Sequence, residues 1–224
     1  MTNTSAFMDW HIRGAIFDLD GVLVDTASYH YRAWKRLAEE LGFPFSEQDN
    51  EQLKGVSRMR SLELLLETGG MAERVSRTEK DALAARKNAW YVEMLEGMTP
   101  GEILPGALEC LRGFRAVGIR TSLGSASRNA GRILERLGLT AMLDAVVDGN
   151  DVEQVKPAPD VFLLAAKRIG IAPSACVVFE DAQAGLEAAC AGGMRAVAVG
   201  TSESLSGYDA KVAGLFEIQP AEWI

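Results

Sequence analysis

The chain has 224 residues, 48% of them hydrophobic, which suffices for one large domain or two small ones with a sizeable core. Its net charge of −8 argues against a nucleic-acid partner, which needs a basic surface. Three cysteines without a CxxC spacing and only two histidines argue against a zinc site, so we expect reduced thiols in a cytoplasmic protein. We see neither a signal peptide nor an apolar run of about 18 residues, and expect no membrane association.

The stretch Gly14 to Asp25 reads GAIFDLDGVLVD and joins an apolar run to two acids. The apolar run predicts a strand that is buried on both faces. Asp18 and Asp20 then point to the same side of an extended chain, and Gly21 permits a sharp turn. Mg²⁺ suits such a site, because one or two carboxylates hold it together with phosphate oxygens. A solvated Asp-rich turn is the alternative that this motif alone leaves open.

Residues 27–97 show helical periodicity and no convincing strand. The first helix ends at Gly42, and we expect Thr26 as its N-cap. A second helix ends at Gly69-Gly70, and a third opens with Thr78-Glu79-Lys80-Asp81, which resembles a capping box. This stretch therefore predicts a small helical domain of its own.

From Pro105 onward, strands alternate with helices. We expect helices near 105–117, 129–137, 159–169 and 182–191, and strands near 119–124, 145–148, 176–179 and 195–199. Such alternation predicts a parallel sheet with helices on both faces. The fold class is therefore α/β, with a Rossmann-like core from residues 1–26 and 98–224 and a helical domain inserted as residues 27–97.

Residues with complementary chemistry follow four predicted strands. In open α/β sheets, ligands bind beyond the carboxyl ends of the strands. The residues at these ends are Asp18 and Asp20, Ser125 with Ser127-Arg128-Asn129, Lys156, and Glu180-Asp181. We expect Mg²⁺ to be held by Asp18 and Asp181, with the backbone carbonyl of Asp20 and the side chain of Glu180 close by. Ser125 would hold phosphoryl oxygens, and Lys156 would neutralise developing charge.

Each of these residues also has a purely structural interpretation. Ser125 and Ser127 could cap the helix that begins near Asn129. Lys156 could be an exposed turn residue, and Glu180-Asp181 could be the acidic start of a helix. The order and placement of all four groups favour the functional interpretation, because four separate strand ends supply parts of one phosphate-and-magnesium site.

These motifs, in this order, resemble those of the haloacid dehalogenase superfamily of aspartyl-phosphate enzymes. Within it the chain is similar to the β-phosphoglucomutases, over residues 14–190. The matching segments are FDLDGVLVDTASYHYRAW, LKGVSR, RKN, GSASRN, KPAPDVF and EDAQAGLEAA. DLDG alone indicates the superfamily, whereas LKGVSR and SASRN are narrower. Arg128 departs from the family pattern, which usually has Lys, and the two cations bind phosphate differently.

The resemblance implies a role for each matched residue. Asp18 would be the nucleophile that becomes an aspartyl phosphate. Asp20 would be the general acid and base for the sugar hydroxyl. Thr26 and His30, at the join between core and insertion, would couple closure to catalysis.

The resemblance also implies that the helical insertion is a cap that closes over the site and excludes water. Lys54 and Lys87 would face the sugar or the hinge. A second phosphate would be held by Arg58, Ser127, Arg128 and Asn129. Arg58 alone would suggest a solvated helix residue, but a mutase that passes through a bisphosphate needs two phosphate sites.

Three functions remain open. The first is a phosphomutase that interconverts β-glucose 1-phosphate and glucose 6-phosphate, and the second is a Mg²⁺-dependent sugar-phosphate phosphatase. The third, a non-catalytic phosphate sensor, would have no use for the nucleophile and acid of Asp18 and Asp20. The cap residues favour the first over the second. We expect a monomer whose partner is a small-molecule sugar phosphate.

Overall fold

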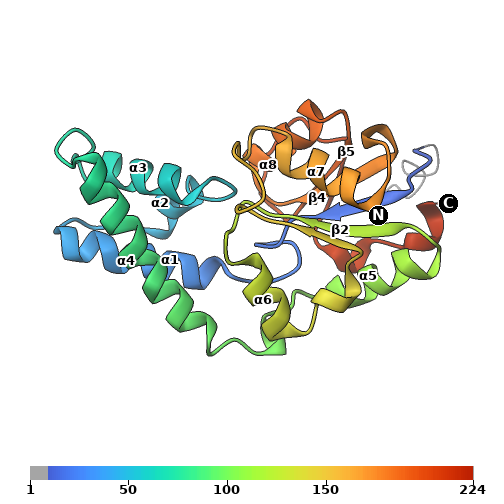
Figure 1. Ribbon diagram of the computed structural model, residues 1–224, viewed down its shortest axis with the longest axis horizontal. Helices are drawn as coiled ribbons and strands as arrows, with labels where there is room; N and C mark the ends of the chain where they lie inside the picture. The colour runs from blue at the N-terminus through green and yellow to red at the C-terminus, as the bar shows by residue number, and fades with distance from the viewer. Residues whose placement is uncertain (1–9, 224) are drawn as a thin grey trace.

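One parallel sheet forms the centre of the molecule, shown in Figure 1 by a computed structural model that describes residues 10–223. Within that range the strand order is β3-β2-β1-β4-β5-β6. The strands are β1 (Gly14–Phe17), β2 (Arg120–Gly124), β3 (Ala145–Val147), β4 (Cys176–Glu180), β5 (Arg195–Val199) and β6 (Ala210–Val212). All five pairings are parallel, as the alternating pattern predicts. The start of the predicted core, residues 1–9, lies outside the described residues.

Strand β1 lies between β2 and β4, and this position sets where the acids meet. Phe17 is in register with Leu123 of β2 and Phe179 of β4. The chain leaves all three strands at one edge, and the amide of Asp18 still donates to the carbonyl of Phe179 at 3.0 Å. The residues that follow β1, β2 and β4 therefore gather at that edge.

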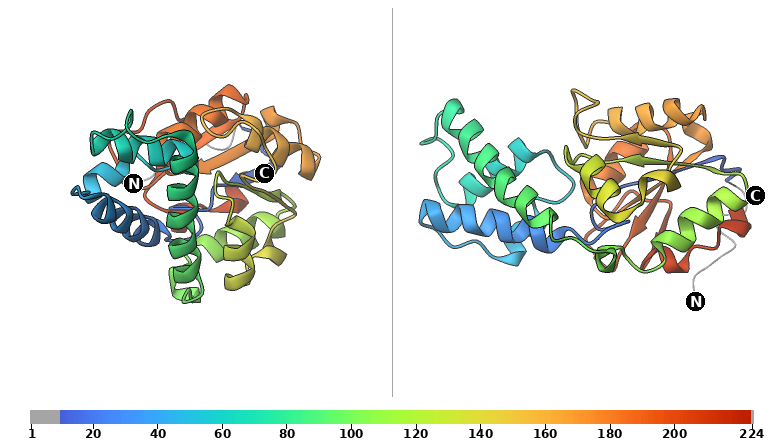
Figure 2. Two further views of the ribbon diagram at one scale, coloured as in Figure 1. Left: turned by 60° about the vertical axis from the view of Figure 1, so that its left-hand side comes forward. Right: turned by 60° about the horizontal axis from the view of Figure 1, so that its bottom comes forward.

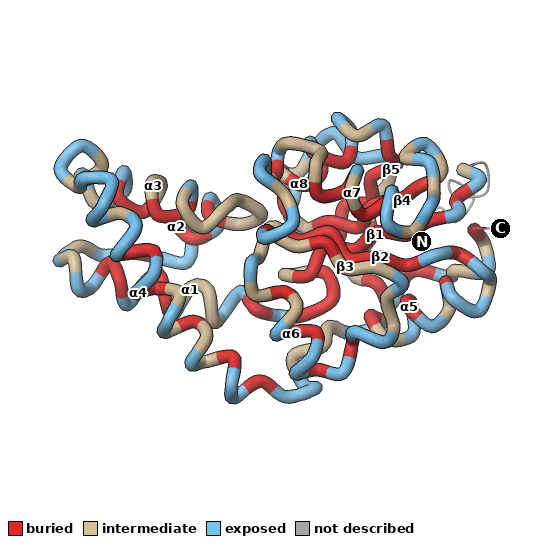
Figure 3. Tube along the Cα trace, in the orientation of Figure 1, coloured by how far each residue is buried: buried red, intermediate tan, exposed pale blue. Residues whose placement is uncertain are grey.

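Helices cover both faces of the sheet, as the views in Figure 2 show. They are α5 (Ala107–Ala116), α6 (Ala130–Leu137), α7 (Asp160–Ile169) and α8 (Gln183–Ala191). Neighbouring strand residues point to opposite faces. Phe17 accordingly packs with Phe114 of α5, whereas Ile16 packs with Phe162 of α7. Burial is continuous along the sheet and the inner sides of these helices (Figure 3).

Residues 27–97 form a separate group of helices beside the sheet (Figure 1). They are α1 (Ala27–Leu41), α2 (Glu47–Glu51), α3 (Arg58–Thr68) and α4 (Arg77–Leu95). Trp34, Leu37, Leu62 and Leu65 belong to a hydrophobic cluster that is distinct from the two clusters of the sheet. We call residues 27–97 the helical insertion. Its last helix still contributes Tyr91 to the cluster of the sheet, so the two parts share apolar contacts.

Short elements complete the described range and include two that the sequence pattern does not predict, α2 and β6. The 3₁₀ helices are Pro100–Glu102, Thr140–Met142, Pro173–Ala175, Leu215–Glu217 and Pro220–Trp223. No helix within residues 10–223 has the length and apolar character needed to cross a membrane.

The caps of two helices differ from expectation. The capping box of α4 is formed by Ser76 and Glu79, not by the run that starts at Thr78. Thr26 occupies the N-cap position of α1, but its side chain makes no capping hydrogen bond. Its hydroxyl donates to the carboxylate of Asp20 instead. A residue that looks like a helix cap thus ties the helical insertion to the strand end.

We expect Phe114→Ala to lower the free energy of unfolding by about 3–5 kcal/mol, the usual cost of removing a buried phenylalanine ring. The ring of Phe114 is fully buried, and its centroid lies 6.0 Å from the ring centroid of Phe17 and 5.8 Å from that of Phe179. Equilibrium denaturation in urea measures the change. Phe216→Ala is the matched control, because Phe216 is 59% exposed. A loss for Phe114→Ala no larger than that of the control would contradict this account of the core.

Candidate active site

A buried lysine bridges two acids at the carboxyl edge of the sheet. Lys156, from the loop before α7, places its Nζ 2.5 Å from Oδ1 of Asp18 and 2.8 Å from Oε2 of Glu180. All three side chains are buried. Burial by itself would lower the pKa of Lys156, but the two carboxylates outweigh it and raise that pKa. The lysine is therefore held as a cation beside Asp18, which the turn interpretation of Lys156 does not explain.

Three acids form a cluster that could hold a divalent cation. Ligand oxygens of Asp18, Glu180 and Asp181 all lie within 4.8 Å of one another. Burial and the charges of Glu180 and Asp18 raise the pKa of Asp181 well above its ordinary value. A cation among these oxygens would relieve that repulsion, and hard oxygen ligands suit Mg²⁺. The residues present therefore fit the predicted metal.

The turn after β1 brings the chain against this cluster. Gly21 has a φ of +80°, and a Cβ at this position would lie 2.1 Å from Oδ2 of Asp181. Only glycine both adopts this positive φ without strain and leaves room for the carboxylate of Asp181, because it has no Cβ. Asp20 lies apart from the acid cluster, because its carboxylate accepts the hydroxyl hydrogen of Thr26. Partial burial and the charge of Asp18 raise the pKa of Asp20 to about 6, which suits a group that gives and takes protons near neutral pH.

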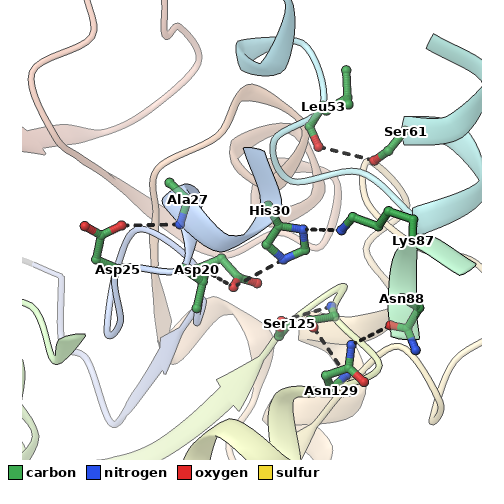
Figure 4. A network of polar contacts seen from close by, with 12 residues as sticks. Asp20, Asp25, Ala27, His30, Leu53, Ser61, Lys87, Asn88, Ser125 and Asn129 are labelled. Carbon is green, nitrogen blue, oxygen red and sulfur yellow. Dashed lines mark hydrogen bonds and ion pairs between the residues drawn. The ribbon is translucent and has the colours of Figure 1, made fainter. Parts of the chain in front are cut away.

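A histidine of the helical insertion faces Asp20, and a lysine of the same insertion contacts the other side of the histidine ring (Figure 4). Nζ of Lys87 lies 3.0 Å from Nδ1 of His30, and Nε2 of His30 lies 3.9 Å from Oδ1 of Asp20. Burial and the charge of Lys87 lower the pKa of His30 well below its ordinary value, so the ring is neutral. A protonated Lys87 can only donate to Nδ1, which leaves the ring hydrogen on Nε2, directed toward Asp20.

Lys87 is almost fully buried between two aromatic rings. Its Nζ lies 4.5 Å from the ring centroid of Trp34 and 4.7 Å from that of Tyr91. Burial and the charge of Arg58 lower the pKa of Lys87 to about 7. The rings offset part of the cost of burying the ammonium group, because a cation is attracted to a ring face.

Basic and amide side chains of α3 and of the loop after β2 form a second group of polar residues. Arg58 begins α3, while Ser127, Arg128 and Asn129 follow β2. Burial and the charge of Arg128 lower the pKa of Arg58, so the two guanidinium groups are near enough to repel each other. We call these four residues the anion corner, since two cations with hydroxyl and amide donors form an arrangement that phosphate would fill.

One cavity of about 410 Å³ joins these groups. Its lining includes every residue predicted to bind substrate, namely Thr26, His30, Lys54, Arg58, Lys87, Ser127, Arg128 and Asn129. Asp18, Asp20 and Asp181 line it as well, whereas Ser125, Lys156 and Glu180 lie behind its wall. Ser125 is fully buried, and its Oγ accepts the amide hydrogen of Ser127 at 3.1 Å. This hydrogen bond lies within the loop and does not cap α6, whose N-cap residue is Asn129. The role of Ser125 in holding phosphoryl oxygens stays a prediction.

Sequence reasoning missed three residues at this cavity. Trp34 and Tyr91 lie in segments with a helical pattern, and only the fold places their rings around Lys87. Asn88 was part of the RKN segment without a role, yet its Oδ1 accepts a hydrogen bond from Nδ2 of Asn129 at 3.0 Å. The polar character of Asn88 beside Lys87 was the only available signal.

We expect Lys87→Met to raise the free energy of unfolding at pH 6 by about 1–4 kcal/mol, as when a buried charge is replaced by an apolar group of similar size. The gain should shrink as the pH rises from 7 toward 10. Between pH 7 and 10 the lysine of the unfolded chain still binds its proton, whereas Lys87 of the folded chain, with its pKa of about 7, has lost it. The free energy of unfolding of the wild type therefore rises with pH in this window.

Thermal and urea unfolding between pH 6 and 10 would measure this gain. Lys35→Met is the matched control, because Lys35 is exposed on α1. A gain that is absent at pH 6, or equal at all pH values, would show that the charge of Lys87 is not costly in the folded state.

Known proteins resemble this chain over most of its length. The model of the haloacid dehalogenase-like hydrolase family matches residues 12–193. A β-phosphoglucomutase of Bacillus subtilis (strain 168) is 42% identical, covering 88% of each chain. A crystal structure of β-phosphoglucomutase from Clostridium difficile superposes with a TM-score of 0.88 at 39% identity, covering 92% of this chain and 93% of that one.

A phosphatase is also among the relatives. A fructose-1-phosphate phosphatase of Escherichia coli (strain K12) is 37% identical over 83% of this chain and 95% of its own. Family membership therefore does not by itself select between phosphoryl transfer to a sugar and transfer to water. The chain belongs to the haloacid dehalogenase-like hydrolase family, as an enzyme of the branch that contains the β-phosphoglucomutases.

Proposed function

We propose that this enzyme interconverts β-D-glucose 1-phosphate and D-glucose 6-phosphate through β-glucose 1,6-bisphosphate. The observation that carries the proposal is one cavity lined both by Asp18, which Lys156 contacts at 2.5 Å, and by the anion corner. A monophosphate hydrolase needs one place for a phosphate, whereas a bisphosphate intermediate needs two. The two β-phosphoglucomutases described above support the same choice.

Asp18 is the proposed nucleophile. Its carboxylate oxygen attacks phosphorus, the bond from phosphorus to the sugar oxygen breaks, and the phosphoryl group is left on Asp18 as an aspartyl phosphate. Lys156 stays protonated beside the reacting oxygen and balances the negative charge that develops. Asp18, Glu180 and Asp181 would hold Mg²⁺, which supplies further positive charge to the phosphoryl oxygens.

Asp20 is the proposed general acid and base. As an acid it gives its proton to the departing sugar oxygen, and as a base it takes the proton of the hydroxyl that attacks the aspartyl phosphate. With a pKa of about 6, both forms are accessible near neutral pH. His30, whose pKa is lowered by burial and by the charge of Lys87, would donate the hydrogen on Nε2 to this carboxylate.

The helical insertion is the proposed cap. His30, Arg58 and Lys87 all belong to it and line the cavity opposite Asp18. Water reaches an exposed aspartyl phosphate more readily than a sugar hydroxyl does. A mutase therefore needs a cap that closes over the bound sugar and excludes water. The alternative is a sugar-phosphate phosphatase, which would use the same Asp18, Asp20 and Lys156 with water as acceptor.

The direct test uses β-glucose 1-phosphate with a trace of the bisphosphate, following glucose 6-phosphate and inorganic phosphate together. We expect glucose 6-phosphate to exceed phosphate, and we expect both to vanish in excess chelator or in Asp18→Asn. Faster release of phosphate than formation of glucose 6-phosphate would instead favour the phosphatase. Full turnover by Asp18→Asn would exclude the proposed nucleophile.

We expect Arg58→Ala to slow isomerisation about ten- to a hundredfold, the equivalent of one charge-assisted hydrogen bond. Arg58 would contact the phosphate that does not react with Asp18 only when the cap is closed. The variant should therefore need a higher concentration of bisphosphate to reach the same rate of isomerisation. Phosphate release from the aspartyl phosphate should change little. A ratio of glucose 6-phosphate to phosphate that matches wild type would contradict this account of closure, and Arg60→Ala, an exposed neighbour on α3, is the control.

A further inference from the structure

One hydrogen bond joins the helical insertion directly to the anion corner. Oδ1 of Asn88, on α4, accepts from Nδ2 of Asn129, which occupies the N-cap position of α6, at 3.0 Å (Figure 4). Both side chains are half-buried, and both line the cavity. The bond therefore connects a side chain of the helical insertion to one of the α/β part within the lining of the cavity.

In this bond the carboxamide of Asn129 has its nitrogen directed at Asn88. An amide group has a donor side and an acceptor side, and only the donor side suits an anion. Asn88 supplies the acceptor, and Nδ2 of Asn129 has a second N–H that this bond does not use. The backbone amide of Asn129 is held as well, since it donates to Oγ of Ser127 at 3.2 Å.

A second contact on the same helix adds to this arrangement. Lys87, the residue before Asn88, contacts His30 at 3.0 Å. One turn of α4 thus reaches both the acid–base group, through His30, and the anion corner, through Asn129. A shift of α4 would disturb the two ends of the cavity together.

We propose that Asn88 is a positioning residue, which orients the amide of Asn129 toward the bound phosphate and couples occupancy of the anion corner to the closed position of α4. The proposal rests on the bisphosphate-binding role given to this corner above. Asn88 itself would not touch the reacting atoms, so its effect should appear in binding of the bisphosphate and not in the chemistry at Asp18.

The test is a double-mutant cycle on the dissociation constant of β-glucose 1,6-bisphosphate, measured by calorimetry with Mg²⁺ in an Asp18→Asn background that prevents turnover. We expect Asn88→Ala to weaken binding about two- to tenfold, the range for one neutral hydrogen bond. Asn129→Ala should weaken it at least as much. The double variant should bind no more weakly than Asn129→Ala alone, because Asn88 acts through Asn129.

Unchanged binding in Asn88→Ala, or effects of the two substitutions that multiply, would overturn the proposal. Arg132→Ala is the matched control, since it removes the ion pair of Arg132 with Glu96 at 3.0 Å, a contact between α6 and the helical insertion outside the cavity. Its binding should match the background. An equal loss in this variant would mean that any contact between the two parts matters, and would also overturn the proposal.

Two further measurements distinguish a failure of the positioning role from a loss of stability and from a failure of the proposed function. Thermal unfolding of each variant should stay close to that of the background, because Asn88 and Asn129 are half-buried. The isomerisation assay on the unaltered enzyme tests the proposed function separately. A wild type that isomerises while Asn88→Ala binds bisphosphate normally would refute only the positioning role, whereas a wild type that does not isomerise would refute the proposed function.

Discussion

The buried ion pairs of Lys156 with Asp18 and Glu180 are the constraint on which the site depends. Removing these three charges from water costs several kcal/mol for each, and only close, hydrogen-bonded geometry can offset that cost. The geometry exists because β1 lies beside β4, so that Asp18 and Glu180 leave the sheet at adjacent positions. The loop before α7 then only has to bring one ammonium group between them. The strand order therefore sets the positions of the two carboxylates between which Lys156 lies.

Most of the α/β part could be predicted from its glycines and its apolar runs. Gly138 and Gly170 each end a helix of this part in the left-handed conformation, as Gly42 does in the helical insertion, which is why the predicted ends of these helices are correct. α2 and β6 have five and three residues, too short for a periodic pattern to form. The capping box of α4 was placed two residues late, because Ser76 and Thr78 both have side chains that can cap.

The residues that the sheet contributes to the cavity could be predicted from the sequence more fully than those of the helical insertion. Residues after parallel strands must meet at one edge, so Asp18, Lys156 and Asp181 could be predicted without side-chain detail. The positions of the other residues depend on how the helical insertion sits over the sheet. The contact of Asn88 with Asn129 follows from that placement, and nothing in local spacing indicates it.

Two cations of the helical insertion, Arg58 and Lys87, cost free energy because other cations lie near them. Burial lowers the pKa of both Arg58 and Lys87, and each is lowered further by a neighbouring cation. A phosphate between Arg58 and Arg128 would relieve the repulsion between these two guanidinium groups. A ligand shifts a conformational equilibrium only by the difference in its interaction with the two states. The repulsion between Arg58 of the helical insertion and Arg128 of the loop after β2 exists only when these two parts lie close together, so an anion bound between the two guanidinium groups would favour closure.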